Sequence, residues 1–218
     1  AAVNGYIEVM KRAEASAQGL APDLRWFIDP FRFSDAATTR SDSRSETTAD
    51  RLRQVREQGF DAIVALGGYV HVASNPGHDF IHRTVIYAPP QQGAPQGKKY
   101  RLAMNMLTLP NRQDLEVHAW TPRTIARYTT LNIDLLNAFD HVSTLFDSFA
   151  GYEGAFDTAM EGYETDPFGP KINVRNEIIA ALGTRVTMMT DYNLPIKVDS
   201  ERFLTAIEVK PEKVDSLK

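Results

Sequence analysis

The fold class is decided by residues 60–87, which read FDAIVALGGYVHVASNPGHDFIHRTVIY. Two runs rich in aliphatic and aromatic residues, Phe60–Ala73 and Phe80–Tyr87, are typical of strands. Between them lies Ser74-Asn75-Pro76-Gly77, in which proline presets φ and glycine accepts a positive φ. The stretch therefore predicts a β-hairpin, and the two strands of a hairpin are antiparallel.

Further strands and helices are predicted on both sides of this hairpin. Short strand-like runs stand at 24–28, 125–133, 185–190 and 203–209. Apolar residues recur at helical spacing in four other stretches: 3–18, 135–149, 155–163 and 174–182. There is no regular alternation of strands and crossover helices. The sequence thus predicts an α+β fold, a mainly antiparallel sheet with amphipathic helices packed on it.

The helix at 135–149 has the clearest amphipathic pattern in the chain. Asp134 is placed to cap its start, and Gly151 is placed to end it. One apolar stripe on this helix is expected to lie in the core: Phe139, Val142 and Phe146.

Two other helix boundaries follow from the same local signals. Thr48 is the expected N-cap of a helix that ends at Gly59. Asn173 is the expected N-cap of a helix that is closed by Gly183. Residues 38–48 are polar and lack an apolar anchor, which predicts a mobile loop.

The length of 218 residues suits one large domain or two small ones. We expect residues 1–218 to form either a single α+β domain or two related subdomains with a break near 108–122. The chain opens on Ala1 without an initiator methionine and stops where Pro211-Glu212-Lys213-Val214 predicts the start of a further helix. We therefore expect it to be a fragment of a longer chain.

Composition excludes several classes of site. The net charge is −4, and the basic groups are short and interrupted, so no nucleic-acid partner is expected. The absence of cysteine excludes disulfides, thiolate metal sites and a cysteine nucleophile. No apolar run approaches the ~20 residues of a membrane-spanning helix. No cofactor is predicted.

The histidines of the hairpin offer the sharpest candidate geometry. If Ser74–Gly77 is a four-residue loop, Tyr69 lies opposite His82, and His71 shares one face with His78 and His82. His78 and His82 are about 13 Å apart along the strand, so at most two of the three could bind one ion. We expect no metal site here and keep His71 and His82 only as binding candidates. Three partly exposed imidazoles are the simpler interpretation.

Catalytic signatures are absent from the sequence. There is no phosphate-binding loop, dinucleotide fingerprint, nucleophile elbow or HExxH motif. Gly67-Gly68 inside a strand pattern indicates a bulge or close backbone approach. Several aromatic residues could line a groove, although their spacing is more typical of core positions: Trp26, Trp120, Phe139, Phe146, Phe149 and Phe156. No catalytic residue is predicted.

Six stretches together resemble an uncharacterised family of large exported bacterial proteins, seen especially in planctomycetes, with a domain of unknown function. They are PDLRWFIDPF (22–31), QGFDAI (58–63), HRT with YAPP (82–84 and 87–90), NAFDH (137–141), LGTRVT (182–187) and ERFLTAIEV (201–209). The resemblance implies export to the periplasm or cell envelope, a longer parent chain and related domains nearby. The family has no assigned activity, so the resemblance transfers no catalytic residues to this chain.

These observations lead to a functional hypothesis, one main alternative and a third interpretation, a purely structural spacer. The function is unknown, and we expect a non-catalytic binding or envelope-organising domain whose partner is a protein or envelope component. The alternative is a hydrolase whose site is assembled from distant carboxylates and histidines. A pocket holding two or more groups with shifted pKa values would favour the enzyme.

Overall fold

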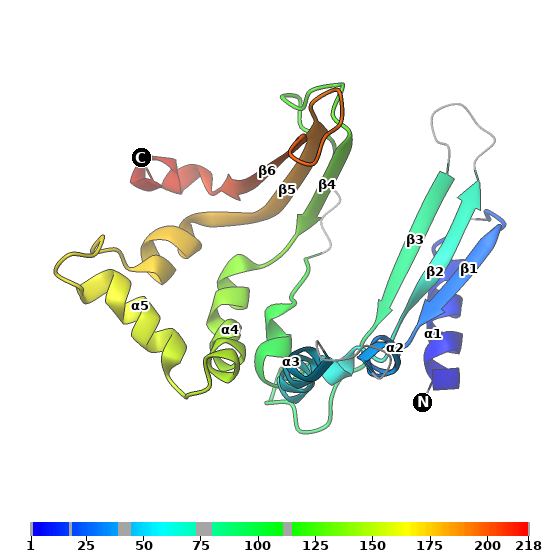
Figure 1. Ribbon diagram of the computed structural model, residues 1–218, viewed down its shortest axis with the longest axis horizontal. Helices are drawn as coiled ribbons and strands as arrows, with labels where there is room; N and C mark the ends of the chain where they lie inside the picture. The colour runs from blue at the N-terminus through cyan, green and yellow to red at the C-terminus, as the bar shows by residue number, and fades with distance from the viewer. Residues whose placement is uncertain (1, 18, 39–44, 73–79, 111–114, 218) are drawn as a thin grey trace. The chain divides into compact units, whose positions relative to one another are not determined.

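The computed structural model describes residues 2–17, 19–38, 45–72, 80–110 and 115–217 (Figure 1). The chain forms two compact units, residues 1–104 and 105–218, and the boundary precedes the break expected near 108–122. Each unit holds a three-stranded antiparallel sheet with helices. The chain therefore has the predicted α+β fold. None of the helices in the described ranges is both long and apolar enough to cross a lipid bilayer.

The first unit is built on the sheet β1-β2-β3, with β2 in the middle. Its strands are β1 (Leu24–Ile28), β2 (Ala65–Val72) and β3 (Phe80–Tyr87). Its helices are α1 (Ala2–Ala15), α2 (Pro30–Thr38) and α3 (Ser45–Glu57), with a 3₁₀ turn at Phe60–Ala62. A further 3₁₀ turn, Leu102–Met106, spans the boundary to the second unit.

Helix α1 packs on one face of this sheet (Figure 1). Its apolar stripe supplies the core of the unit, because Val9 and Met10 bury against Ala65. One turn further on, Ala13 packs against Tyr69, whose side chain is almost fully buried. Burial of these apolar side chains stabilises the unit, at about 25 cal/mol per Å² removed from water.

The two glycines of β2 make close backbone approaches, as their place inside a strand pattern predicts. A Cβ atom on Gly68 would lie 1.8 Å from the backbone oxygen of Arg83 on β3. A Cβ atom on Gly67 would lie 2.7 Å from the oxygen of Trp26 and 2.7 Å from a methyl of Val9. The middle strand can therefore sit between β1, β3 and α1 only because both residues lack a side chain.

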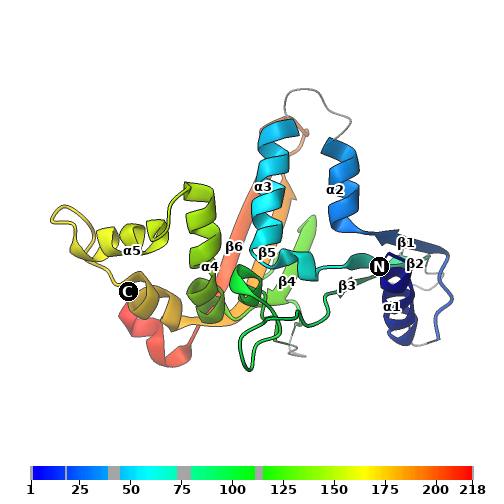
Figure 2. The ribbon, with the colours of Figure 1, turned by 90° about the horizontal axis from the view of Figure 1, so that it is seen from below.

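Helices α2 and α3 lie side by side (Figure 2). Arg56 on α3 joins them, since it is 2.8 Å from Asp35 and its guanidinium lies 4.8 Å from the ring centre of Phe31. The expected N-cap at Thr48 is wrong, because α3 already begins at Ser45. Gly59 does follow the helix, with φ of 91°. Residues 39–44 of the expected mobile loop lie outside the described residues.

The predicted hairpin is present, but its register differs by one residue from the expected one. Val70, not Tyr69, pairs with His82, and His71 pairs with Ile81. The turn residues 74–77 lie outside the described residues. A shift of one residue moves every side chain of one strand to the other face, because side chains alternate along a strand. His71 and His82 therefore lie on opposite faces of the sheet.

The second unit is built on the sheet β4-β5-β6, with β5 in the middle. Its strands are β4 (Arg127–Asn132), β5 (Leu182–Tyr192) and β6 (Glu201–Val209). Its helices are α4 (Leu135–Ala150) and α5 (Ala155–Thr165). Short turns complete it: a π turn at Val174–Ile178 and 3₁₀ turns at Ile179–Ala181 and Pro211–Leu217.

Helix α4 begins and ends as predicted. The Asp134 side chain accepts a hydrogen bond from the amide of Asn137, and Gly151 follows the last residue with φ of 84°. The core assignment of Phe146 is wrong, because 43% of this residue is exposed. It packs edge-on against Phe156 of α5, at 5.7 Å between ring centres, and this contact leaves much of its side chain open to solvent.

The helix expected after Asn173 is shorter than predicted. Asn173 does accept a hydrogen bond from the amide of Asn176, but a single π turn follows instead of an α-helix. Gly183 does not close a helix, because it already lies in β5. Pairing of Leu182 with Val209 on β6 draws these residues into the sheet.

Candidate functional site

The two histidines predicted as binding candidates do not form a site together. The Nδ1 atom of His71 lies 2.8 Å from the backbone oxygen of Ala21 and 3.2 Å from a carboxylate oxygen of Asp23. The Nε2 atom of His82 accepts a hydrogen bond of 3.1 Å from the indole of Trp26. His78 lies outside the described residues. Among those described, no group of three or more His, Asp or Glu side chains could hold a metal ion.

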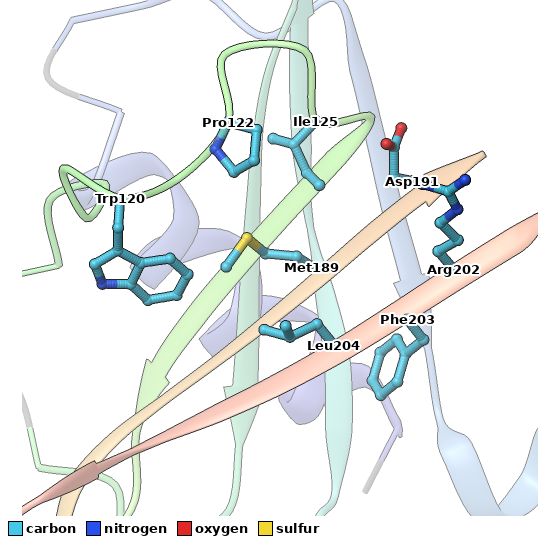
Figure 3. Close-up of a pocket in the computed structure, with 8 residues that line it drawn as sticks. All are labelled: Trp120, Pro122, Ile125, Met189, Asp191, Arg202, Phe203 and Leu204. Carbon is cyan, nitrogen blue, oxygen red and sulfur yellow. The ribbon is translucent and has the colours of Figure 1, made fainter. Parts of the chain in front are cut away.

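The second unit contains an apolar pocket of about 390 Å³ (Figure 3). Strands β5 and β6 form its floor, and the segment before β4 forms its wall. Its lining residues are Trp120, Pro122, Ile125, Met189, Asp191, Arg202, Phe203 and Leu204.

Strand register explains why these residues converge although they are distant in sequence. Met189 pairs with Leu204, and Asp191 pairs with Arg202. Directly opposite residues of an antiparallel pair point to the same face, so the four side chains form one patch. The buried Met189 lies at its centre, with the segment that carries Trp120 and Ile125 beside it (Figure 3).

A ladder of polar side chains attaches this wall segment to the sheet. The Nε2 atom of His118 lies 3.4 Å from the hydroxyl of the buried Thr187, which lies 3.2 Å from the hydroxyl of Thr130. Arg185 donates to the hydroxyl of Thr130 and to the backbone oxygen of Glu116. These bonds satisfy polar groups that would otherwise be costly to bury.

The wall of the pocket is an aromatic stack. The His118 ring lies behind the Trp120 ring, 5.0 Å away and inclined by only 15°. Trp120 is nevertheless 55% exposed. A large apolar side chain that is held by a neighbour and left open to solvent offers a flat contact surface at low entropic cost.

Tyr128 stands beside the polar ladder and has a shifted pKa. Burial alone would raise the pKa of its hydroxyl. Hydrogen bonds from Thr187, from the His118 backbone and from Arg185, with the positive charge of Arg185, outweigh burial and lower that pKa below its ordinary value. This is one shifted group next to the pocket, where the enzyme alternative requires at least two within it. The hydrolase hypothesis stays a prediction.

The pocket carries charge at one end only. Asp191 and Arg202 lie at the end away from Trp120 (Figure 3). Arg202 also donates a hydrogen bond to the side-chain oxygen of Asn193. The pocket can therefore contact an apolar body along its length and a polar group at one end.

A second hollow, of about 440 Å³, lies on the first unit beside α1. Its lining is half charged and half apolar or aromatic, and an exposed ion pair of 3.1 Å joins Arg25 to Glu14 within it. Such an exposed pair contributes little energy, so no strong polar group fixes a ligand in this hollow. We therefore take the pocket of the second unit as the candidate site.

The sequence indicated only part of this site. Trp120 was among the aromatic residues that could line a groove, and it does line the pocket. Met189, Asp191 and Leu204 carried no signal, because only the pairing of β5 with β6 brings them together. No protein-family model matches the chain, and no curated protein or solved structure does so.

Proposed function

We propose that this protein is a non-catalytic binding module whose second unit takes an apolar group of its ligand into the pocket. The observation that carries the proposal is the pocket itself, in which an exposed Trp120 faces a floor formed by Met189 and Leu204. Ligand sites are typically concave and mostly apolar, with a few polar groups that orient the ligand.

The size of the pocket limits the class of ligand. Small-molecule sites span about 300–1,000 Å³, and this pocket of about 390 Å³ is near the lower end. It fits one or two rings or a branched chain. At the charged end, Arg202 can donate to an anionic or carbonyl group while Asp191 accepts from a donor.

Anilinonaphthalene sulfonate is a suitable probe, because it combines aromatic rings with an anion that suits Arg202. The chain has two tryptophans, so Trp26→Phe leaves Trp120 as the sole donor of energy transfer. We expect energy transfer from Trp120 to the probe. Ile125→Asp should weaken binding at least tenfold, because a carboxylate would line an apolar wall.

Val72→Asp is the matched control, since Val72 is an exposed apolar residue of the first unit. It should leave the energy transfer unchanged. Absence of transfer, or transfer that Ile125→Asp does not weaken, would contradict the proposal. Circular dichroism of each variant separates loss of binding from loss of fold.

We also propose that the module acts outside the cytoplasm, in binding or organising components of a bacterial cell envelope. This part is supported only by the resemblance to large exported bacterial proteins. Fractionation of a bacterium that produces the native full-length protein tests it. Recovery of the protein in the cytoplasmic fraction alone would contradict it.

A further inference from the structure

Strand β6 is an edge strand of the second unit, with β5 on one side only. Its middle part, Phe203–Ile207, has no charge and no proline. Its large apolar residues are open to solvent, with Phe203 exposed by 65%, Leu204 by 48% and Ile207 by 41%. Edge strands are normally protected by charges, proline or bulges, so an unprotected edge invites pairing with another strand.

We propose that β6 pairs antiparallel with β6 of a second copy of this chain, around a twofold axis at Thr205. The pairing places Arg202 opposite Glu208 of the second copy, and Phe203 opposite Ile207. Leu204 then meets Ala206, and Thr205 meets Thr205. A closed symmetric dimer requires this kind of self-complementary surface.

The positions of the charges select this register. The symmetric pairing forms the Arg202–Glu208 contact twice, once at each end. If the axis moves one residue to Leu204, Arg202 lies opposite Ala206, and if it moves one residue to Ala206, Arg202 lies opposite Lys210. Cross-strand pairs of opposite charge stabilise a sheet, and like charges directly opposite each other destabilise it.

The other edge strands of the described sheets lack this property. They are β1, β3 and β4, which read LRWFI, FIHRTVIY and RYTTLN. Each of these strands contains an arginine but no carboxylate. If such a strand paired antiparallel with the same strand of a second copy, no pair of opposite charges would form. Among these edges, β6 is the one that carries both signs at symmetric positions.

Side-chain alternation agrees with the proposed pairing. Arg202, Leu204 and Glu208 lie on one face of β6, and Phe203 and Ile207 lie on the other. Paired residues of the two copies therefore point to the same face. The dimer would join two three-stranded sheets into one of six strands. Pairing of edges alone buries a modest area, so we expect a weak dimer, with Kd on the order of 10–100 µM.

A single cysteine tests the twofold axis directly, because the chain contains no cysteine. In Thr205→Cys the two thiols of a dimer would lie directly opposite each other, with Cα atoms about 4.5–5.5 Å apart, within disulfide range. Mild oxidation should therefore give a covalent dimer. Ala206→Cys should not cross-link, because residue 206 of one copy lies opposite residue 204 of the other. The two thiols would therefore be diagonal neighbours and too far apart.

Thr84→Cys is the matched control, because Thr84 is an exposed threonine on the edge strand β3 of the first unit. It should remain reduced or cross-link only slowly. Failure of Thr205→Cys to cross-link faster than Thr84→Cys would overturn the proposal. Equal cross-linking of Thr205→Cys and Ala206→Cys would overturn the register.

Charge reversal provides a second, independent test by sedimentation equilibrium. Arg202→Glu should weaken the dimer roughly tenfold or more, because each of the two contacts becomes a pair of like charges. Glu208→Arg should do the same. The double variant should restore the dimer, because it exchanges the two charges. A monomeric wild type at about 100 µM, or a double variant as weak as the single ones, would contradict the pairing.

The pairing goes beyond the proposed binding function and can fail separately from it. Thr205 and Glu208 do not line the pocket, so their variants test association without altering the pocket wall. Ile125→Asp changes the wall but not β6, so it should weaken probe binding at least tenfold while the dimer persists.

Discussion

The two units of the molecule share one plan. Each runs strand, helix, helix, strand, strand, and in each the first strand pairs with the second and the second with the third. In both, an Ile-Asp pair lies where the first strand gives way to the next helix (Ile28-Asp29 and Ile133-Asp134), and the aspartate caps that helix. Asp29 accepts from the Arg32 amide at 3.1 Å, and Asp134 accepts from the Asn137 amide at 2.9 Å.

The two units differ in what covers one face of the sheet, the face that carries the residue two positions before this aspartate. Phe27 and Asn132 each stand two residues before it, so they occupy equivalent positions on the first strand. In the first unit that face is apolar, and α1 closes it with Val9 and Met10. In the second unit the face is partly polar, and a segment without helix is attached to it through His118 and leaves a pocket.

The comparison shows that one strand order can support either a closed core or an open site. The element before the first strand decides between them. A helix that presents an apolar stripe expels water from the sheet face. An irregular segment held by a few hydrogen bonds covers the face incompletely, and the part left uncovered can bind a ligand.

The largest expected effect comes from adding a methyl group to the middle strand of the first unit. Gly68→Ala places a Cβ atom against the backbone of Arg83, which cannot move without breaking the pairing of β2 with β3. We expect a loss of about 3 kcal/mol or more, measured by urea unfolding. Gly183→Ala is the control in the second unit, because its Cβ would meet the flexible side chain of Glu208. Equal losses for both variants would refute this distinction.

The second-largest effect concerns the elements that cover the two sheets. Helix α1 should contribute more to stability than the segment that carries Trp120. Val9→Ala removes two methyl-sized groups from a fully buried position and should cost about 2 kcal/mol of unfolding free energy. Trp120→Ala removes a larger but half-exposed side chain and should cost less than about 1 kcal/mol while abolishing probe binding. A larger stability loss in Trp120→Ala would show that the wall segment is core.

Removing the aspartate cap should lower the free energy of unfolding by a smaller amount, which should be equal in the two units. Asp29→Ala and Asp134→Ala each leave one helix amide without its side-chain acceptor, which typically costs about 1 kcal/mol. Asp29→Asn and Asp134→Asn keep an acceptor and should restore most of the loss. Thermal melting of the four variants checks this. Losses that differ between the two positions by more than about 1 kcal/mol would indicate that the caps are not equivalent.

The smallest effect concerns Tyr128, whose pKa in the folded protein is lowered below its ordinary value of about 10. Between the folded and the unfolded pKa, the Tyr128 hydroxyl is protonated in the unfolded chain and ionised in the folded protein. Tyr128 therefore stabilises the fold increasingly as pH rises through this range. That contribution is complete above about pH 10 and vanishes as pH falls through the folded value. Tyr128→Phe should therefore lose more stability relative to wild type at about pH 10 than at about pH 7. A difference that does not change with pH would contradict the shift.

Much of the local structure could be predicted from short-range signals. The strand at Leu24–Ile28 stops before Asp29-Pro30, and the helix from Leu135 begins after a capping aspartate, because capping and turn formation depend on neighbouring residues. The exposure of Phe146 could not be predicted, since it depends on how much of α4 is covered by α5.

The site was less predictable, because its residues meet only through pairing. His71 and His82 were assigned to one face on the assumption of a four-residue loop, and the observed register separates them. A slip of one residue changes no local preference but reverses the face of every side chain on one strand. For the same reason, nothing local to Asp191 or Arg202 indicated that they share the end of a pocket.

The sequence by itself determined the α+β class, the antiparallel hairpin, the capped helix α4 and the need for glycine in β2. These follow from residue spacing and backbone chemistry, which act over a few positions. Only the tertiary structure decided the strand register, the division after Met104 and the pocket beneath Trp120. Those features depend on which residues far apart in the chain are buried against each other. The conformational preferences of neighbouring residues do not determine this.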